Sequence, residues 1–129
     1  MTTIARAMAL LLGLGITLAA AADPSPDARR EINYLLGYIE KSGCAFNRNG
    51  SWHDAKAARD HIRVKYDYIV ARDGINTTED FIEKAATKSS MWFGQPYTVK
   101  CDSGAPVPSS QWLTAELTHF RTLSPKAPL

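Results

Sequence analysis

His61 and Lys65 are the two side chains whose types and spacing best suit a chemical role in this chain. They are four positions apart in a segment with a helical repeat, so both lie on one border of the same helix face. A neighbouring ammonium lowers the pKa of an imidazole and keeps the ring neutral near physiological pH. The pair could therefore hold an anionic ligand or supply a base, or His61 could instead join the edge of the core to a second helix.

Three short polar segments could complete a binding surface with this pair. Arg48-Asn49-Gly50 could present a guanidinium and backbone N–H groups to a carboxylate or phosphate, or it could form a surface turn before a helix. Ser89-Ser90 and Tyr97 lie on either side of an apolar loop that contains Trp92 and Phe93, which either plug the core or mark a partner surface. The predicted ligand- or partner-binding residues are Arg48, Asn49, His61, Lys65, Ser89, Ser90 and Tyr97.

Catalysis and metal binding receive less support from the motifs. A hydrolase or transferase could use His61 as base near Ser89 or Ser90, but the chain has no G-x-S-x-G or S-x-x-K motif. His53 and His61 are eight positions apart, about 12 Å along a common helix, which is too far for the two rings to share one ion. We therefore predict no metal site and no cofactor.

The element that must position His61 and Lys65 is a long amphipathic helix over Ser51–Arg72. Ser51 with Asp54 three residues later is a capping-box pattern, and Gly74 is a natural stop. Apolar residues recur at spacings of three and four on one face, namely Ala55, Ala58, Ile62, Tyr66 and Ile69. We expect the other elements to pack around this helix.

Cap signals predict three further helices. The first begins at Ser25-Pro26, with serine as N-cap and proline as the first helical residue. Another follows Thr77, which precedes acidic residues of a first turn. The last is capped by Ser109 or Ser110.

Cys44 and Cys101 form one disulfide if the protein is exported, because an even pair in an oxidising compartment is most simply bonded. Tyr97–Cys101 alternates like a short strand, and the disulfide would place it beside Cys44–Arg48. The expected fold is therefore mainly α, with about four helices packed around one long central helix and a short two-stranded β ribbon clipped by the disulfide.

Residues 1–22 have the pattern of a cleaved secretory signal, with a basic Arg6, an apolar run and small residues up to Ala22. The mature chain, 23–129, is expected to be a single small globular domain, ordered over roughly 25–122. Without Arg6, 14 basic and 13 acidic side chains remain, and the two signs are interleaved. This pattern argues against a nucleic-acid partner, and we expect an exported protein that does not span the membrane.

Five motifs in this order, behind a signal sequence, resemble a family of small secreted bacterial proteins catalogued as domain of unknown function 5329. They are Phe46-x-Arg48-Asn49-Gly50, Ala58-x-x-His61-Ile62-x-x-Lys65, Phe81-Ile82, Ser89-Ser90 and Gly94-x-Pro96-Tyr97. The resemblance covers roughly Glu31 to Arg121 and implies a periplasmic location in a bacterium with two membranes. It implies no activity. The chain departs from the family at Phe93, where a small polar residue is expected before Gly94.

We therefore predict a non-catalytic binding or accessory protein of the cell envelope, whose partner is an envelope protein or a small anionic ligand. The alternative is a small periplasmic hydrolase or transferase with His61 as base. A serine hydroxyl within hydrogen-bond reach of the His61 ring, in a concave pocket, would favour the enzyme. A third possibility, a stabiliser of a larger assembly, would expose Trp92 and Phe93.

Overall fold

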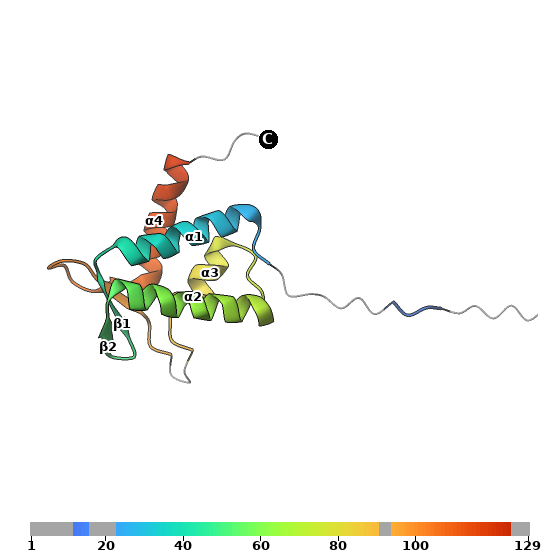
Figure 1. Ribbon diagram of the computed structural model, residues 1–129, viewed down its shortest axis with the longest axis horizontal. Coiled ribbons are helices and arrows are strands. Elements are labelled where there is room, and N and C mark those ends of the chain that lie inside the picture. Colours follow the sequence, from blue (N-terminus) through green and yellow to red (C-terminus); the bar gives the residue numbers. More distant parts are fainter. Residues whose placement is uncertain (1–11, 16–22, 91–93, 125–129) are drawn as a thin grey trace, which may run out of the picture.

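The computed structural model describes residues 12–15, 23–90 and 94–124, and within these residues the chain forms four helices and one four-stranded antiparallel sheet (Figure 1). The helices are α1 (Pro26–Lys41), α2 (Ala55–Arg72), α3 (Thr78–Ala85) and α4 (Ser109–Leu123). The strands are β1 (Ala45–Arg48), β2 (Ser51–His53), β3 (Thr98–Lys100) and β4 (Val107–Pro108). Trp92 and Phe93, as well as most of the proposed signal, lie outside the described residues. No helix in the described part of the chain is both long enough and apolar enough to cross a membrane.

Helix α1, and not the longer α2, is the centre of the fold. It packs against each of the other three helices, whereas α2 runs alongside α1 and α3 (Figure 1). Ile32, Leu35 and Ile39 of α1 are fully buried. The buried face of α2 includes the small side chains of Ala55 and Ala58, so it removes less apolar surface from water. The predicted long central helix is therefore wrong.

The β1–β2 hairpin replaces the predicted first turn of the long helix. Arg48 pairs with Ser51, and the two residues between them, Asn49 and Gly50, have φ values of 51° and 82°. Positive φ at both central positions is the pattern of the type I′ turns that connect paired strands. Ser51 is therefore a strand residue and not a cap. Helix α2 begins at Ala55, and the Asp54 carboxylate accepts the N–H of Ala57 as its N-cap bond.

The predicted ribbon is present as the β1–β3 pair, but it is the middle of a larger sheet. The strand order is β2-β1-β3-β4, and Phe46 of β1 lies opposite Val99 of β3, with both side chains buried. Strand β4 leads directly into α4, whose N-cap is Pro108 and which has no side-chain cap. The predicted serine cap is wrong because the N–H of Ser109 donates to the carbonyl of Tyr97, 2.8 Å away, and extends the sheet pairing.

The caps predicted for α1 and α3 are confirmed. The Ser25 hydroxyl accepts the N–H of Ala28, with Pro26 as the first helical residue. Thr77 and Asp80 form a reciprocal capping box, in which each side chain accepts the other residue's backbone N–H. Both signals depend on residues three positions apart, so the sequence alone is sufficient to predict them.

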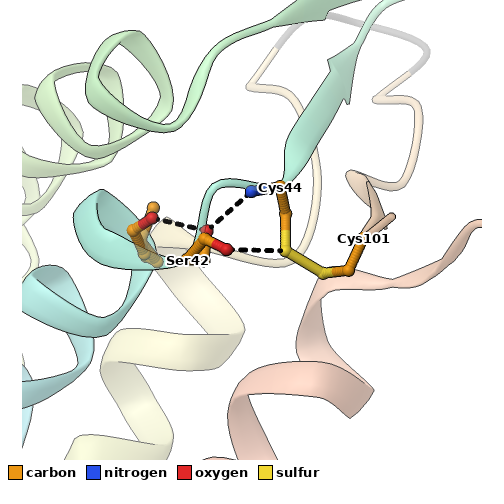
Figure 2. The surroundings of a disulfide bond; sticks show 4 residues. Ser42, Cys44 and Cys101 are labelled. Carbon is orange, nitrogen blue, oxygen red and sulfur yellow. Dashed lines mark hydrogen bonds between the residues drawn. A yellow bond between two sulfur atoms is a disulfide. The ribbon is translucent and has the colours of Figure 1, made fainter. Parts of the chain in front are cut away.

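The disulfide between Cys44 and Cys101 is confirmed (Figure 2). It joins the residue before β1 to the residue after β3, at the end of their paired stretch. Ser42 fixes the approach to Cys44, because its hydroxyl donates to the carbonyl of Ile39 at 2.8 Å and accepts the N–H of Cys44 at 3.2 Å. The end of α1 is thereby tied to the start of the sheet.

A polar cluster joins α4 to α1 and α3. The Arg121 guanidinium donates to Glu31 through Nε and Nη2, at 2.5 and 3.0 Å, and to Glu79 through Nη1 at 2.6 Å. The hydroxyl of Thr78 also donates to Glu31, which is buried. The hydrogen bonds from Arg121 hold the pKa of Glu31 and of Glu79 below their ordinary value of 4.5.

Replacing both cysteines tests the contribution of the disulfide to stability. The bond spans 57 positions, and chain-entropy arguments give such a loop about 4 kcal/mol. Cys44→Ala/Cys101→Ala should therefore lower the free energy of unfolding in urea by about that amount. Reductant should destabilise the natural chain equally and leave the double variant unaffected. Equal stability of the natural and double-variant proteins would contradict the prediction.

The cluster around Glu31 predicts a loss of stability in acid. Its contribution is complete above pH 4.5 and disappears as the pH falls through the lowered folded-state pKa, because the unfolded chain takes up the proton more readily. Glu31→Gln should lower the free energy of unfolding at pH 7 and flatten its decline between pH 5 and 3. Glu83→Gln, at an exposed position of α3, is the matched control and should retain the natural pH dependence. Parallel curves for Glu31→Gln and the natural chain would refute this role.

Candidate functional site

Six of the seven predicted site residues line one open groove of about 550 Å³. The groove lies between the β1–β2 hairpin, α2 and the segment that follows α3. Its lining residues are Arg48, Asn49, Ser51, His53, His61, Ser89, Ser90 and Tyr97. Lys65 is the predicted residue outside this lining, and it contacts the groove through Tyr97. The structure thus brings the predicted residues together, and ligand binding by them stays a prediction.

The sheet positions Arg48 and Tyr97. Residues two apart in a strand share a face, so Arg48 projects to the same side as the buried Phe46, and Tyr97 to the same side as the buried Val99. The pairing ends at Asn47 and Thr98, so Arg48 and Tyr97 are the next residues of the two segments at the same end of the pair. Two polar side chains therefore lie beyond the buried pair of Phe46 and Val99 on this sheet face.

His61 of α2 lies between these two side chains. Arg48 Nη1 donates to His61 Nδ1, and His61 Nε2 is 3.2 Å from the hydroxyl oxygen of Tyr97. A guanidinium has only N–H donors, so Nδ1 accepts and Nε2 carries the proton. Burial lowers the pKa of His61, and the charges of Arg48 and Lys65 lower it further. The ring is therefore a neutral donor to Tyr97.

This arrangement does not favour His61 as a general base. The accepting nitrogen of the neutral ring is already bound by Arg48, and the other nitrogen carries a proton directed at Tyr97. Ser89 and Ser90 line the groove, but the hydrogen-bond partners of both ring nitrogens are Arg48 and Tyr97. The hydrolase alternative required a serine hydroxyl on this ring.

Lys65 contacts Tyr97 through both its hydroxyl group and its ring. Its Nζ donates to the carbonyl of Lys88 at 2.6 Å and to the Tyr97 hydroxyl at 3.4 Å, and lies 5.2 Å from the centre of the tyrosine ring. Burial lowers the pKa of Lys65, and the charge of Lys88 adds to this effect. Burial raises the pKa of Tyr97. The tyrosine is therefore a neutral hydroxyl held between an imidazole and an ammonium.

Backbone pairing places Ser89 and Ser90 at the groove. The N–H of Ser89 donates to the carbonyl of Gln95 at 3.0 Å, and the N–H of Tyr97 donates to the carbonyl of Thr87 at 2.9 Å. These two bonds close the base of the segment between α3 and β3. Ser89 is buried and Ser90 is exposed at the groove.

His53 is a lining residue that was not among the predicted site residues. On the predicted helix, His53 and His61 would be about 12 Å apart. In the structure His53 belongs to β2, pairs with Phe46, and lines the same groove as His61. The signal that could have found it is Asn49-Gly50, because an Asn-Gly pair between two short strands is typical of a hairpin.

A second, smaller cavity of about 70 Å³ lies against the groove and shares Arg48, His53, His61 and Tyr97 with it. Its remaining lining residues are Phe46, Asn47, Ala57, Ala58, Ile62 and Ser109. Neither set of lining residues contains an aspartate or glutamate. Within the described ranges, no group of three or more His, Cys, Asp or Glu side chains is placed to hold a metal ion. The site can therefore offer positive charge and N–H or O–H donors to a ligand.

Burial lowers the pKa of His61 most, and the charge of Arg48 lowers it further. In an NMR titration, the ring of His61 should change protonation below its ordinary pKa of 6.5. Arg48→Met keeps an unbranched apolar stem and removes the charge, so it should raise this pKa toward 6.5 without reaching it, because the ring stays buried. Arg63→Met, at an exposed position of α2, should leave the titration unchanged. An unaltered pKa in Arg48→Met would show that the guanidinium does not act on the ring.

Comparison with known proteins places these residues in a family. Residues 26–121 match the family described as a family of unknown function, DUF5329. The uncharacterised protein YfeK of Salmonella typhimurium strain LT2 is 35% identical over 88 residues, which cover 67% of this chain and 71% of that protein. No solved structure matches the chain. The match spans α1 to α4 and includes the whole groove, and the chain therefore belongs to the DUF5329 family.

Proposed function

We propose that the protein is a non-catalytic binding protein of the bacterial envelope whose groove captures a small anion. The observation that carries this proposal is the pair of cations, Arg48 and Lys65, held on either side of the His61–Tyr97 contact in a lining without carboxylates. Both side chains carry a positive charge, so an anion at the groove would be attracted to both of them.

The donors of the cluster are arranged to bind a ligand. Arg48 has five N–H groups, and only one of them is needed for His61 Nδ1. The Tyr97 hydroxyl accepts from Lys65 and lies beside the protonated nitrogen of His61, so its own O–H can be donated to a ligand. Such hydrogen bonds are stronger than those at an open surface, because the donors are charged and the partly buried site has a lower local dielectric constant than water. The groove thereby suits a carboxylate or phosphate.

An envelope location fits the chemistry of the chain. The pattern of residues 1–22 is typical of a cleaved export signal, and a disulfide such as Cys44–Cys101 is typical of an oxidising compartment. The similar protein named above is from a bacterium. We therefore propose the periplasm as the place where the groove meets its ligand, which can be a free anion or an acidic group on an envelope protein.

Titration with two simple anions tests the binding function. In ¹H–¹⁵N NMR spectra, acetate and inorganic phosphate should each shift the amide signals of Arg48, Ser90 and Tyr97. Arg48→Met should weaken this binding by about tenfold or more, because hydrogen bonds from a charged donor are lost. Its thermal stability should be unchanged or raised, since a half-buried charge is removed.

Arg63→Met is the matched control for the loss of one positive charge on the protein. It should bind both anions as the natural chain does, because Arg63 lies outside both sets of lining residues. Equal anion binding by Arg48→Met and Arg63→Met would refute the groove as the binding site. Turnover of ester or amide substrates that disappears in His61→Ala would instead restore the hydrolase alternative.

A further inference from the structure

The smaller cavity forms an inner chamber of the groove. Arg48, His53, His61 and Tyr97 belong to the lining of both spaces, so a ligand at these side chains can extend from one into the other. The chamber has a volume of about 70 Å³. Since about 10–15 Å³ of such space is enough for one water molecule, the chamber accommodates on the order of five non-hydrogen atoms.

The chamber differs from the groove in chemistry. Beyond the shared side chains, its wall is made largely by the apolar groups of Phe46, Ala57, Ala58 and Ile62. The two alanines leave space that a larger side chain would fill. A charged group would lose its hydration in such a space, whereas a short carbon chain would be favoured there. The anionic end of a ligand therefore belongs in the groove and an uncharged end in the chamber.

Ser109 provides one polar group in the chamber. The residue is 1% exposed, and its hydroxyl has no hydrogen-bond partner within the described part of the chain. Ser109 is the first residue of α4, but Pro108 is the N-cap and no side chain caps this helix. The fold therefore does not use this hydroxyl, and a buried polar group without a partner is unfavourable. Such a group is explained if a ligand completes its hydrogen bonding.

We propose that the ligand is a short-chain organic acid that carries a hydroxyl or carbonyl group at the end remote from its carboxylate. The carboxylate binds Arg48 and the Tyr97 hydroxyl in the groove, the carbon chain lies against Ala57 and Ile62, and the terminal polar group bonds Ser109. This inference rests on the proposed anion-binding function and adds the class of ligand to it.

Three probes separate the parts of the proposed ligand, namely acetate, butyrate and 4-hydroxybutyrate. Acetate carries the charged group alone, butyrate adds an apolar chain, and 4-hydroxybutyrate adds a terminal hydroxyl. Affinities measured by NMR titration should increase in this order. Burial of the chain should tighten binding about tenfold over acetate, and a hydrogen bond to Ser109 should add about fivefold.

Ser109→Ala tests the polar contact. It should reduce the affinity for 4-hydroxybutyrate to that for butyrate, while acetate binding and butyrate binding remain as in the natural chain. Its melting temperature should be unchanged or higher, because the hydroxyl has no partner in the described structure. Ser110→Ala, one residue further along α4 and outside the chamber lining, is the matched control and should keep the full order of affinities.

Ala57→Leu tests the chamber itself. Ala57 is exposed at the edge of the chamber, so a leucine can fill the space without disturbing the core. Butyrate and 4-hydroxybutyrate should then bind no more tightly than acetate. Ala71→Leu, at another exposed alanine of α2, should behave as the natural chain does.

The outcomes distinguish the two proposals. If acetate itself fails to bind, the anion-binding function is refuted. If acetate binds through Arg48 but the three probes bind equally, the chamber holds water only and the present inference is overturned. A marked loss of stability in Ser109→Ala would also overturn it, because the hydroxyl would then serve the fold.

Discussion

The antiparallel pairing of β1 with β3, closed at one end by the Cys44–Cys101 bond, is the constraint on which the site depends. It joins two segments that are separated by about fifty residues of chain, and α2 and α3 lie between them in sequence. The disulfide fixes one end of the pair, and the register then places Arg48 and Tyr97 at the other end. Without this pairing, the two polar side chains would belong to unrelated loops.

The charged side chains at that end of the sheet are all positive. Arg48 and Lys65 are both positive, His61 is neutral, and neither cavity is lined by an acidic side chain. Hydrogen bonds among Arg48, His61, Tyr97 and Lys65 offset part of the cost of burying these groups. Opposite charges are paired elsewhere, for example in the Glu31–Arg121 cluster that joins three helices. The contrast between these two clusters supports the proposal that the groove binds an anion.

The difference between the buried side chains of α1 and α2 explains where the cavities lie. Helix α1 forms the core with large aliphatic side chains that are fully buried, among them Ile32 and Leu35. Helix α2 turns small alanines toward the sheet near its N-terminus, and the inner chamber occupies that space. Close packing is therefore concentrated around α1, where it stabilises the fold. The looser contact between α2 and the sheet leaves room for a ligand.

The sequence by itself determined the features that depend on neighbours in the chain. The caps at Ser25 and Thr77 and the period of the helices follow from interactions within about four residues. The two cysteines could be paired because the number of cysteines is even and an oxidising compartment was expected. The candidate residues were also found, because charged and aromatic side chains beside apolar positions are visible in the sequence itself. The β1–β3 ribbon was predicted by a different route, because the alternation of Tyr97–Cys101 indicates a strand and the disulfide places it beside Cys44–Arg48.

Tertiary structure alone decided how these elements combine. Ser51 and His53 are helix residues by local pattern, yet a strand forms because β1 offers them backbone partners that a first helical turn lacks. The same pairing moves His53 into the groove beside His61. Which helix is central depended on total buried area, and α1 buries larger side chains than α2. Which nitrogen of His61 donates and which accepts depends on Arg48 and Tyr97, which come from other segments of the chain. Likewise, the Ser109 hydroxyl is buried without a partner only in the folded chain. Neither feature can be predicted from residue types alone.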